Sequence, residues 1–162
     1  MSVRPKTLKI VVHCSATKAS QDIGFKEIDR MHKARGFLET STGIHCGYHE
    51  IIRRDGTIEL GRALANIGAH AFGFNYTSVG ICMIGGLDED GKSENNFTSS
   101  QFDSLIATLM HKTLIYPDAE IVGHRDLSPD ADGNGVVTSK EWMKDCPCFD
   151  VKQWLALSGV LA

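Results

Sequence analysis

Two histidines and a cysteine, far apart in the chain, are the residues best suited to carry chemistry. His13 ends one apolar run, His124 ends another, and Cys146 follows near the C-terminal end of the chain. Two imidazoles and one thiolate form a three-ligand set for Zn²⁺ that leaves the fourth position to water, as in catalytic zinc sites. Because spacing cannot show that three distant segments meet, residue types alone make this zinc site a hypothesis.

A second metal motif lies between His124 and Cys146. Residues 130–141 match the twelve-residue calcium loop, in which alternate oxygens converge on one ion. The predicted oxygen ligands are Asp130, Asp132, Asn134, Val136 (through its backbone carbonyl) and Glu141, and Gly135 allows the sharp turn. No helix precedes the loop, although residues 140–143 are expected to start a short one after it. The alternative is a surface loop rich in Asp, Gly and Asn.

Composition narrows the class of protein. The chain has 162 residues, of which 42% are hydrophobic and 23% charged, with a formal net charge of −3. This length fits one domain, expected to span residues 1–162. The absence of a basic block argues against a nucleic-acid partner bound through phosphates. No apolar run is long enough to span a bilayer, and the start of the chain does not resemble a signal peptide.

The cysteine count favours reduced thiols. An odd number of cysteines without a secretion signal is typical of a reducing compartment. The five are Cys14, Cys46, Cys82, Cys146 and Cys148. Cys82 lies in an apolar run and is expected in the core. Cys14 and Cys148 are expected to pack beside the ligands, and an oxidation-prone pair of Cys146 and Cys148 is the alternative.

The pattern of apolar residues predicts strands alternating with helices, and therefore an α/β domain. Strands are expected at 9–13, 47–53, 57–60, 78–84 and 120–124, with an Asp-Gly turn closing a hairpin at 54–56. Helices are expected at 25–35, from a capping box at Thr98 to about residue 114, and at 151–157 after an Asp150 cap. Phe25, Ile28 and Met31 should form the buried stripe of the first helix. Both histidines fall where strands end in loops, which is where sites commonly form.

Several stretches resemble the phage-lysozyme type of N-acetylmuramoyl-L-alanine amidase, a zinc amidase family related to peptidoglycan recognition proteins. The matching stretches are VHCSATK, GYHEIIRRDGTIELGR, IGAHAFGFNYTSVGICMIGG, GHRDLSP and KDCPCFD. They follow the family's order over nearly the whole chain. The resemblance implies a mixed central sheet flanked by helices, with His13, His124 and Cys146 as zinc ligands. It also assigns Tyr48 and Lys144 as the two catalytic side chains.

The residue types agree with these roles. The phenol of Tyr48 can donate to a water or to a developing oxyanion, and the ammonium of Lys144 can stabilise that oxyanion. The calcium-like loop makes Lys140 a rival to Lys144, although Lys-x-Cys-Pro supports Lys144. His70 could line the substrate groove, as the same stretch does in relatives, or it could be a loop histidine without a role. Strand alternation turns His49 away from Tyr48, so His49 is interpreted as structural.

The resemblance implies a phage or prophage endolysin that hydrolyses the bond between N-acetylmuramic acid and L-alanine in peptidoglycan. The protein would be held in the host cytoplasm until lysis and would then act on the cell wall, most simply as a monomer. Two alternatives are a cytosolic wall-recycling amidase and a non-catalytic peptidoglycan-binding module. The first carries Asp where Cys146 stands, and the second commonly lacks the cysteine. Contact with a phage RNA polymerase is a further implication that no residue here tests.

Overall fold

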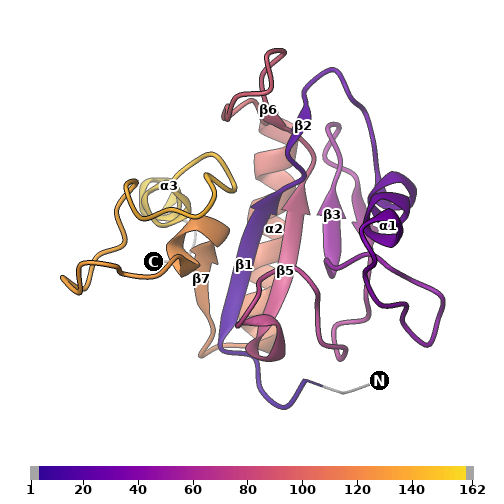
Figure 1. Ribbon diagram of the computed structural model, residues 1–162, viewed down its shortest axis with the longest axis horizontal. Helices are drawn as coiled ribbons and strands as arrows, with labels where there is room; N and C mark the ends of the chain where they lie inside the picture. Colours follow the sequence, from indigo (N-terminus) through magenta and orange to yellow (C-terminus); the bar gives the residue numbers. More distant parts are fainter. Residues whose placement is uncertain (1–3, 160–162) are drawn as a thin grey trace.

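A mixed sheet forms the centre of the fold (Figure 1). The structure is a computed structural model that describes residues 4–159, and within them the main sheet has the strand order β4-β3-β5-β1-β7. Its strands are β1 (Lys9–Cys14), β3 (Glu50–Ile52), β4 (Ile58–Leu60), β5 (Ser78–Met83) and β7 (Glu120–Gly123). β1 pairs in parallel with β5 and β7, β3 pairs in parallel with β5, and only β4 runs antiparallel. β2 (Thr17–Lys18) and β6 (Gly86–Leu87) form a small second sheet.

Alternation along β1 separates the core from the site. Ile10 and Val12 point to the face covered by α2 (Ser99–Ile115), where they pack in one cluster with Leu105 and Leu109. Figure 1 shows α2 crossing behind the sheet. Because successive side chains point to opposite faces, Val11 and His13 lie on the other side. His13 therefore reaches the loops at the carboxyl end of β1.

Local signals correctly predicted where two helices begin. The Thr98 hydroxyl accepts from the backbone N–H of Gln101, and the Gln101 side chain accepts from Thr98 N–H, which completes the capping box of α2. Asp150 caps α3 (Val151–Ser158) by accepting from Gln153 N–H. α3 packs beside β7 and carries the end of the chain back against the sheet.

The buried face of α1 (Phe25–Ala34) differs from the prediction. Ile28 and His32 are buried, whereas Met31 is 42% exposed. His32 turns inward because its Nδ1 accepts a 2.8 Å hydrogen bond from the N–H of Gly47. That long-range contact rotates the inward stripe of α1 away from Met31.

The short helix expected at residues 140–143 does not form. Residues 139–141 make a turn instead, and the Glu141 carboxylate accepts from the backbone N–H groups of Ala131 and Thr138. A side chain that satisfies backbone donors in this way competes with helix formation. None of the helices in residues 4–159 has the length and apolar character needed to cross a membrane.

Candidate metal centre and cleft

His13, His124 and Cys146 meet at one point. One potential ligand atom from each lies within 4.8 Å of the other two. His13 Nδ1 is 3.9 Å from Cys146 Sγ, and the His13 and His124 rings are 4.6 Å apart between centroids. β1 and β7 are adjacent parallel strands, so their carboxyl ends bring the two histidines together.

Burial keeps the imidazoles of the cluster neutral. Desolvation is the largest effect on His13 and lowers its pKa well below 6.5, with nearby His70 and His124 adding to the shift. Desolvation also lowers the pKa of His124, and the positive charge of Lys144 adds to it. A neutral imidazole keeps the lone pair that a metal ion needs. Two neutral imidazoles and a buried thiol form a donor set that fits Zn²⁺.

Cys146 is held by backbone contacts on both sides. The N–H of Cys14 donates to Cys146 Sγ at 3.3 Å, and Cys146 O accepts from Arg125 N–H at 2.7 Å. The first contact joins the cysteine to the end of β1. The second joins it to the 3₁₀ segment His124–Leu127 that follows β7.

Arg125 is a site residue that sequence reasoning missed. Its buried guanidinium pairs with Asp145 at 3.2 Å and with Asp150 at 3.4 Å, and it lies 4.0 Å from the centre of the Trp142 ring. Arg125 therefore clamps the segment that carries Lys144 and Cys146 onto the rest of the site. Its position directly after His124 was the available signal, but its partners are distant in sequence.

Tyr48 and Lys144 reach the same cavity as the three ligands. The Tyr48 ring lies 5.1 Å from the His13 ring, and burial raises the pKa of the phenol well above 10. Lys144 is exposed and lines the cavity beside His124, whereas the rival Lys140 is not among the lining residues. His49 is turned away from the metal cluster, with its Nε2 3.0 Å from Asn66 O.

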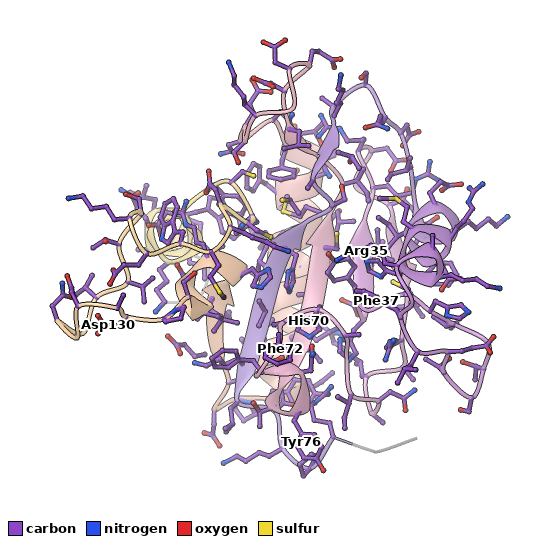
Figure 2. All side chains as sticks on the ribbon, viewed as in Figure 1. Arg35, Phe37, His70, Phe72, Tyr76 and Asp130 are labelled. Atoms are coloured by element: carbon purple, nitrogen blue, oxygen red, sulfur yellow. The ribbon has the colours of Figure 1, made fainter. Side chains whose placement is uncertain are left out.

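The metal centre opens into a groove. A cavity of about 280 Å³ over the cluster shares Arg35, Phe37, His70 and Lys144 with a neighbouring cavity of about 410 Å³. The Arg35 guanidinium carbon lies 5.0 Å from the centre of the Phe37 ring. Phe72, which is 99% exposed, lines the second cavity, and Figure 2 shows these labelled side chains on one side of the sheet. The groove therefore combines cations with exposed aromatic surface.

The calcium-like loop lies apart from the groove. Asp130, Asp132 and Glu141 each offer an oxygen within 4.8 Å of the others. The Asp130 carboxylate accepts from the N–H groups of Gly133 and Gly135, which curls the loop around that side chain. Figure 2 shows Asp130 at the outer end of the molecule, far from His70. The loop does not contribute to the lining of the cleft.

Comparison with known proteins shows which family the chain belongs to. The profile of the N-acetylmuramoyl-L-alanine amidase family matches residues 4–148. The chain is 42% identical to the endolysin of Klebsiella phage KP32 over 93% of this chain and 87% of that protein. It is 41% identical to the endolysin of Escherichia phage T7, with the same coverage of both chains. Its fold is similar to that of the amidase LysC from Clostridium intestinale URNW, at a TM-score of 0.70 and 24% identity over 98% of this chain and 93% of that one. The chain therefore belongs to the N-acetylmuramoyl-L-alanine amidase family, as a hydrolase of the phage-endolysin type.

Proposed function

We propose that this chain is a zinc-dependent endolysin that cleaves the amide bond between N-acetylmuramic acid and L-alanine in peptidoglycan. We further propose that residues 1–162 form one amidase domain with an inserted calcium loop at 130–141. The enzyme would be made in the host cytoplasm and would act on the wall after release. The convergence of His13, His124 and Cys146 at the floor of an open cleft is the observation that carries the proposal.

A small number of residues would carry out the proposed amide hydrolysis. Zinc bound by His13, His124 and Cys146 would polarise the amide carbonyl and supply a water of lowered pKa. Lys144, at the rim of the cavity, stabilises the negative charge that develops on the carbonyl oxygen. Tyr48 keeps its proton because burial raises its pKa, so its O–H donates to the attacking water or to the oxyanion.

Cys146 favours a lytic amidase over the two alternative functions. A wall-recycling amidase would carry Asp at this position, and a module that only binds peptidoglycan would commonly lack the cysteine. Here the thiol faces His13 and is held by the amide of Cys14. The substrate groove, with Arg35 and Lys144 among its lining residues, suits the carboxylates of a peptidoglycan stem peptide.

The ligand assignment is tested by zinc content and activity together. Cys146→Ser and His124→Ala should each lose bound zinc and wall-lytic activity, because each removes one of three protein ligands. His111→Ala, which removes an exposed histidine of α2 outside the cleft lining, is the matched control and should keep both. Full activity in Cys146→Ser, or in chelator-treated protein shown to be free of metal, would reject the zinc mechanism.

The calcium proposal has separate support. The ligand spacing of residues 130–141 matches a calcium loop, and three of its carboxylates already converge. Carboxylates held this close repel one another unless a cation lies between them. Calcium should therefore bind the folded protein and raise its Tm by mass action.

Calorimetric titration of zinc-loaded protein with Ca²⁺ tests this loop. Wild type should release binding heat and gain thermal stability, whereas the double variant Asp130→Ala, Glu141→Ala should do neither. The double variant Glu39→Ala, Asp118→Ala removes two exposed carboxylates elsewhere and should behave as wild type. If wild type shows neither binding heat nor a Tm shift at millimolar Ca²⁺, residues 130–141 are a surface loop that does not bind calcium.

A further inference from the structure

His70 stands directly behind the metal centre. Its Nδ1 lies 2.9 Å from His13 Nε2, while its Nε2 lies 3.4 Å from Ser78 Oγ. His13 in turn presents Nδ1 to Cys146 Sγ, on the side where the three ligands converge. The His70 ring therefore connects the hydroxyl of Ser78 to the ring nitrogen of His13 that points away from the metal site.

The direction of these hydrogen bonds follows from Ser78. Its hydroxyl donates to Phe74 O at 2.8 Å, so its oxygen is left to accept. His70 then donates from Nε2–H to Ser78, and its Nδ1 has a free lone pair. That lone pair accepts from Nε2–H of His13. The chain of bonds fixes the proton of His13 on Nε2 and leaves Nδ1 bare toward the metal site.

The backbone is shaped to hold the His70 ring. A Cβ at Gly80 would lie 2.6 Å from His70 Cγ, and a Cβ at Gly68 would lie 2.4 Å from His70 Cδ2. Only glycine leaves room for the ring on these two sides. The Asn75 side chain accepts from the N–H groups of His70 and Ala71, at 2.8 Å each, which anchors the start of the loop. The ring is thus confined by the fold and not only by its hydrogen bonds.

We propose that His70 is a positioning residue that sets the tautomer and orientation of His13 for metal binding, and not primarily a substrate contact. The inference rests on the proposed function, because it requires a metal at His13. Ring nitrogens of metal-bound histidines are commonly oriented by an acceptor on their far side, and loss of that acceptor costs about 10–100-fold in metal affinity or activity. Here the acceptor is another histidine, itself fixed by Ser78.

Zinc affinity of two His70 variants tests the proposal. His70→Asn keeps an oxygen acceptor near the position of Nδ1, whereas His70→Leu has similar bulk and no acceptor. In competition with a chromophoric chelator, His70→Leu should bind zinc about 10–100-fold more weakly than wild type, and His70→Asn should recover most of the loss. Phe72→Ala changes the exposed groove wall and should leave zinc affinity unchanged. Equal affinity of His70→Leu and wild type would overturn the proposal.

The outcomes separate this inference from the proposed function. A wild-type protein without zinc affinity would reject the proposed function itself. Wild-type affinity in His70→Leu, together with a raised KM for peptidoglycan fragments, would instead make His70 a substrate contact. If both variants lose zinc equally, the acceptor has no role and the proposal is rejected.

A second measurement does not depend on replacing His70. Nitrogen-15 NMR of the imidazoles distinguishes a proton on Nε2 from one on Nδ1. In wild type, His70 and His13 should both carry the proton on Nε2, and Ser78→Ala should admit the other tautomer at His70. A proton on Nδ1 of His70 in the wild-type protein would contradict the proposed direction of the hydrogen bonds.

Discussion

Burial separates the roles open to Tyr48 and Lys144. The Tyr48 phenol lies within the site and stays protonated, because desolvation raises its pKa well above 10. Lys144 lies at the exposed rim and brings a positive charge beside His124. One side chain therefore offers a hydrogen-bond donor and the other offers charge, and in the proposed mechanism both would act on the oxygen that becomes negative.

Tyr48→Phe and Lys144→Ala should lower kcat while zinc stays bound. Loss of one donor to an oxyanion typically costs on the order of 10²–10³ in kcat. Lys140→Ala, in the turn just before, is the control and should retain wild-type turnover. Loss of activity in Lys140→Ala, together with wild-type activity in Lys144→Ala, would show that Lys140 and not Lys144 is the catalytic lysine.

Arg35 should act in binding and not in turnover. It lines the groove beside the Phe37 ring, and its side chain is exposed. A hydrogen bond to a charged group is worth about 1.5–3 kcal/mol, so Arg35→Ala should raise KM for stem-peptide substrates by roughly tenfold or more. Arg30→Ala removes an exposed arginine of α1, the helix that ends just before Arg35, outside the groove, and should change neither kcat nor KM. A fall in kcat alone would argue against this role.

At the scale of elements, local capping signals predicted where two helices begin, whereas a contact between distant residues decided which face of α1 is buried. The capping box of α2 depends on Thr98 and Gln101 alone, so the sequence predicts it. The inward face of α1 depends on a hydrogen bond between His32 and Gly47, which no local pattern reports. In the loop after position 130, Glu141 bonds to the backbone of the loop and prevents the expected helix.

Arg125 shows why part of the site escaped prediction. Its partners Asp145 and Asp150 lie 20 and 25 residues away, and only the folded chain brings them together. Its removal would break both ion pairs and the contact with the Trp142 ring, while the two partly exposed carboxylates would stay solvated. Arg125→Ala should therefore destabilise the protein by about 1–3 kcal/mol and weaken zinc binding through the loosened Cys146 segment.

Chemical denaturation and chelator competition measure these two effects of Arg125→Ala. Arg53→Ala is a suitable control, because Arg53 pairs with Asp22 and Glu59 at a surface remote from the cleft lining. Its zinc affinity should equal that of wild type. Undiminished zinc affinity in Arg125→Ala would mean that Cys146 is held by its backbone contacts alone.

The whole molecule explains how distant residues form one site. Parallel pairing of β1 with β7 brings His13 and His124 to the same edge of the sheet, as their positions at strand ends suggested. The segment between His124 and α3 returns to that edge and brings Cys146 there, and strand patterns do not predict this return. Spacing alone could not predict that these three segments meet. The family resemblance did predict it, because its motifs include all three segments.

Buried histidines should make stability depend on pH. Burial is the main cause that lowers the pKa of His32 and of His49 to about 4 in the folded protein, against an ordinary value of 6.5. The unfolded chain therefore takes up protons first as pH falls. Stability is fully present above pH 6.5 and is lost as pH falls toward 4, by on the order of 3 kcal/mol for each histidine.

Urea denaturation of zinc-free protein between pH 7.5 and 4 would measure this loss. His32→Asn keeps an acceptor for Gly47 but cannot take up a proton, so its stability should fall less steeply across the range. His111→Asn, at an exposed position of α2, should follow wild type. Stability that stays constant down to pH 4 would show that these imidazoles are not buried as neutral groups.

Product analysis of digested cell wall tests the central claim most directly. Purified peptidoglycan treated with zinc-loaded enzyme should release stem peptides with a new L-alanine amino terminus and should gain no reducing sugar ends. The same enzyme stripped of metal should release neither, and added zinc should restore the peptides. New reducing ends, or peptides cut at another bond, would contradict an amidase built on His13, His124 and Cys146.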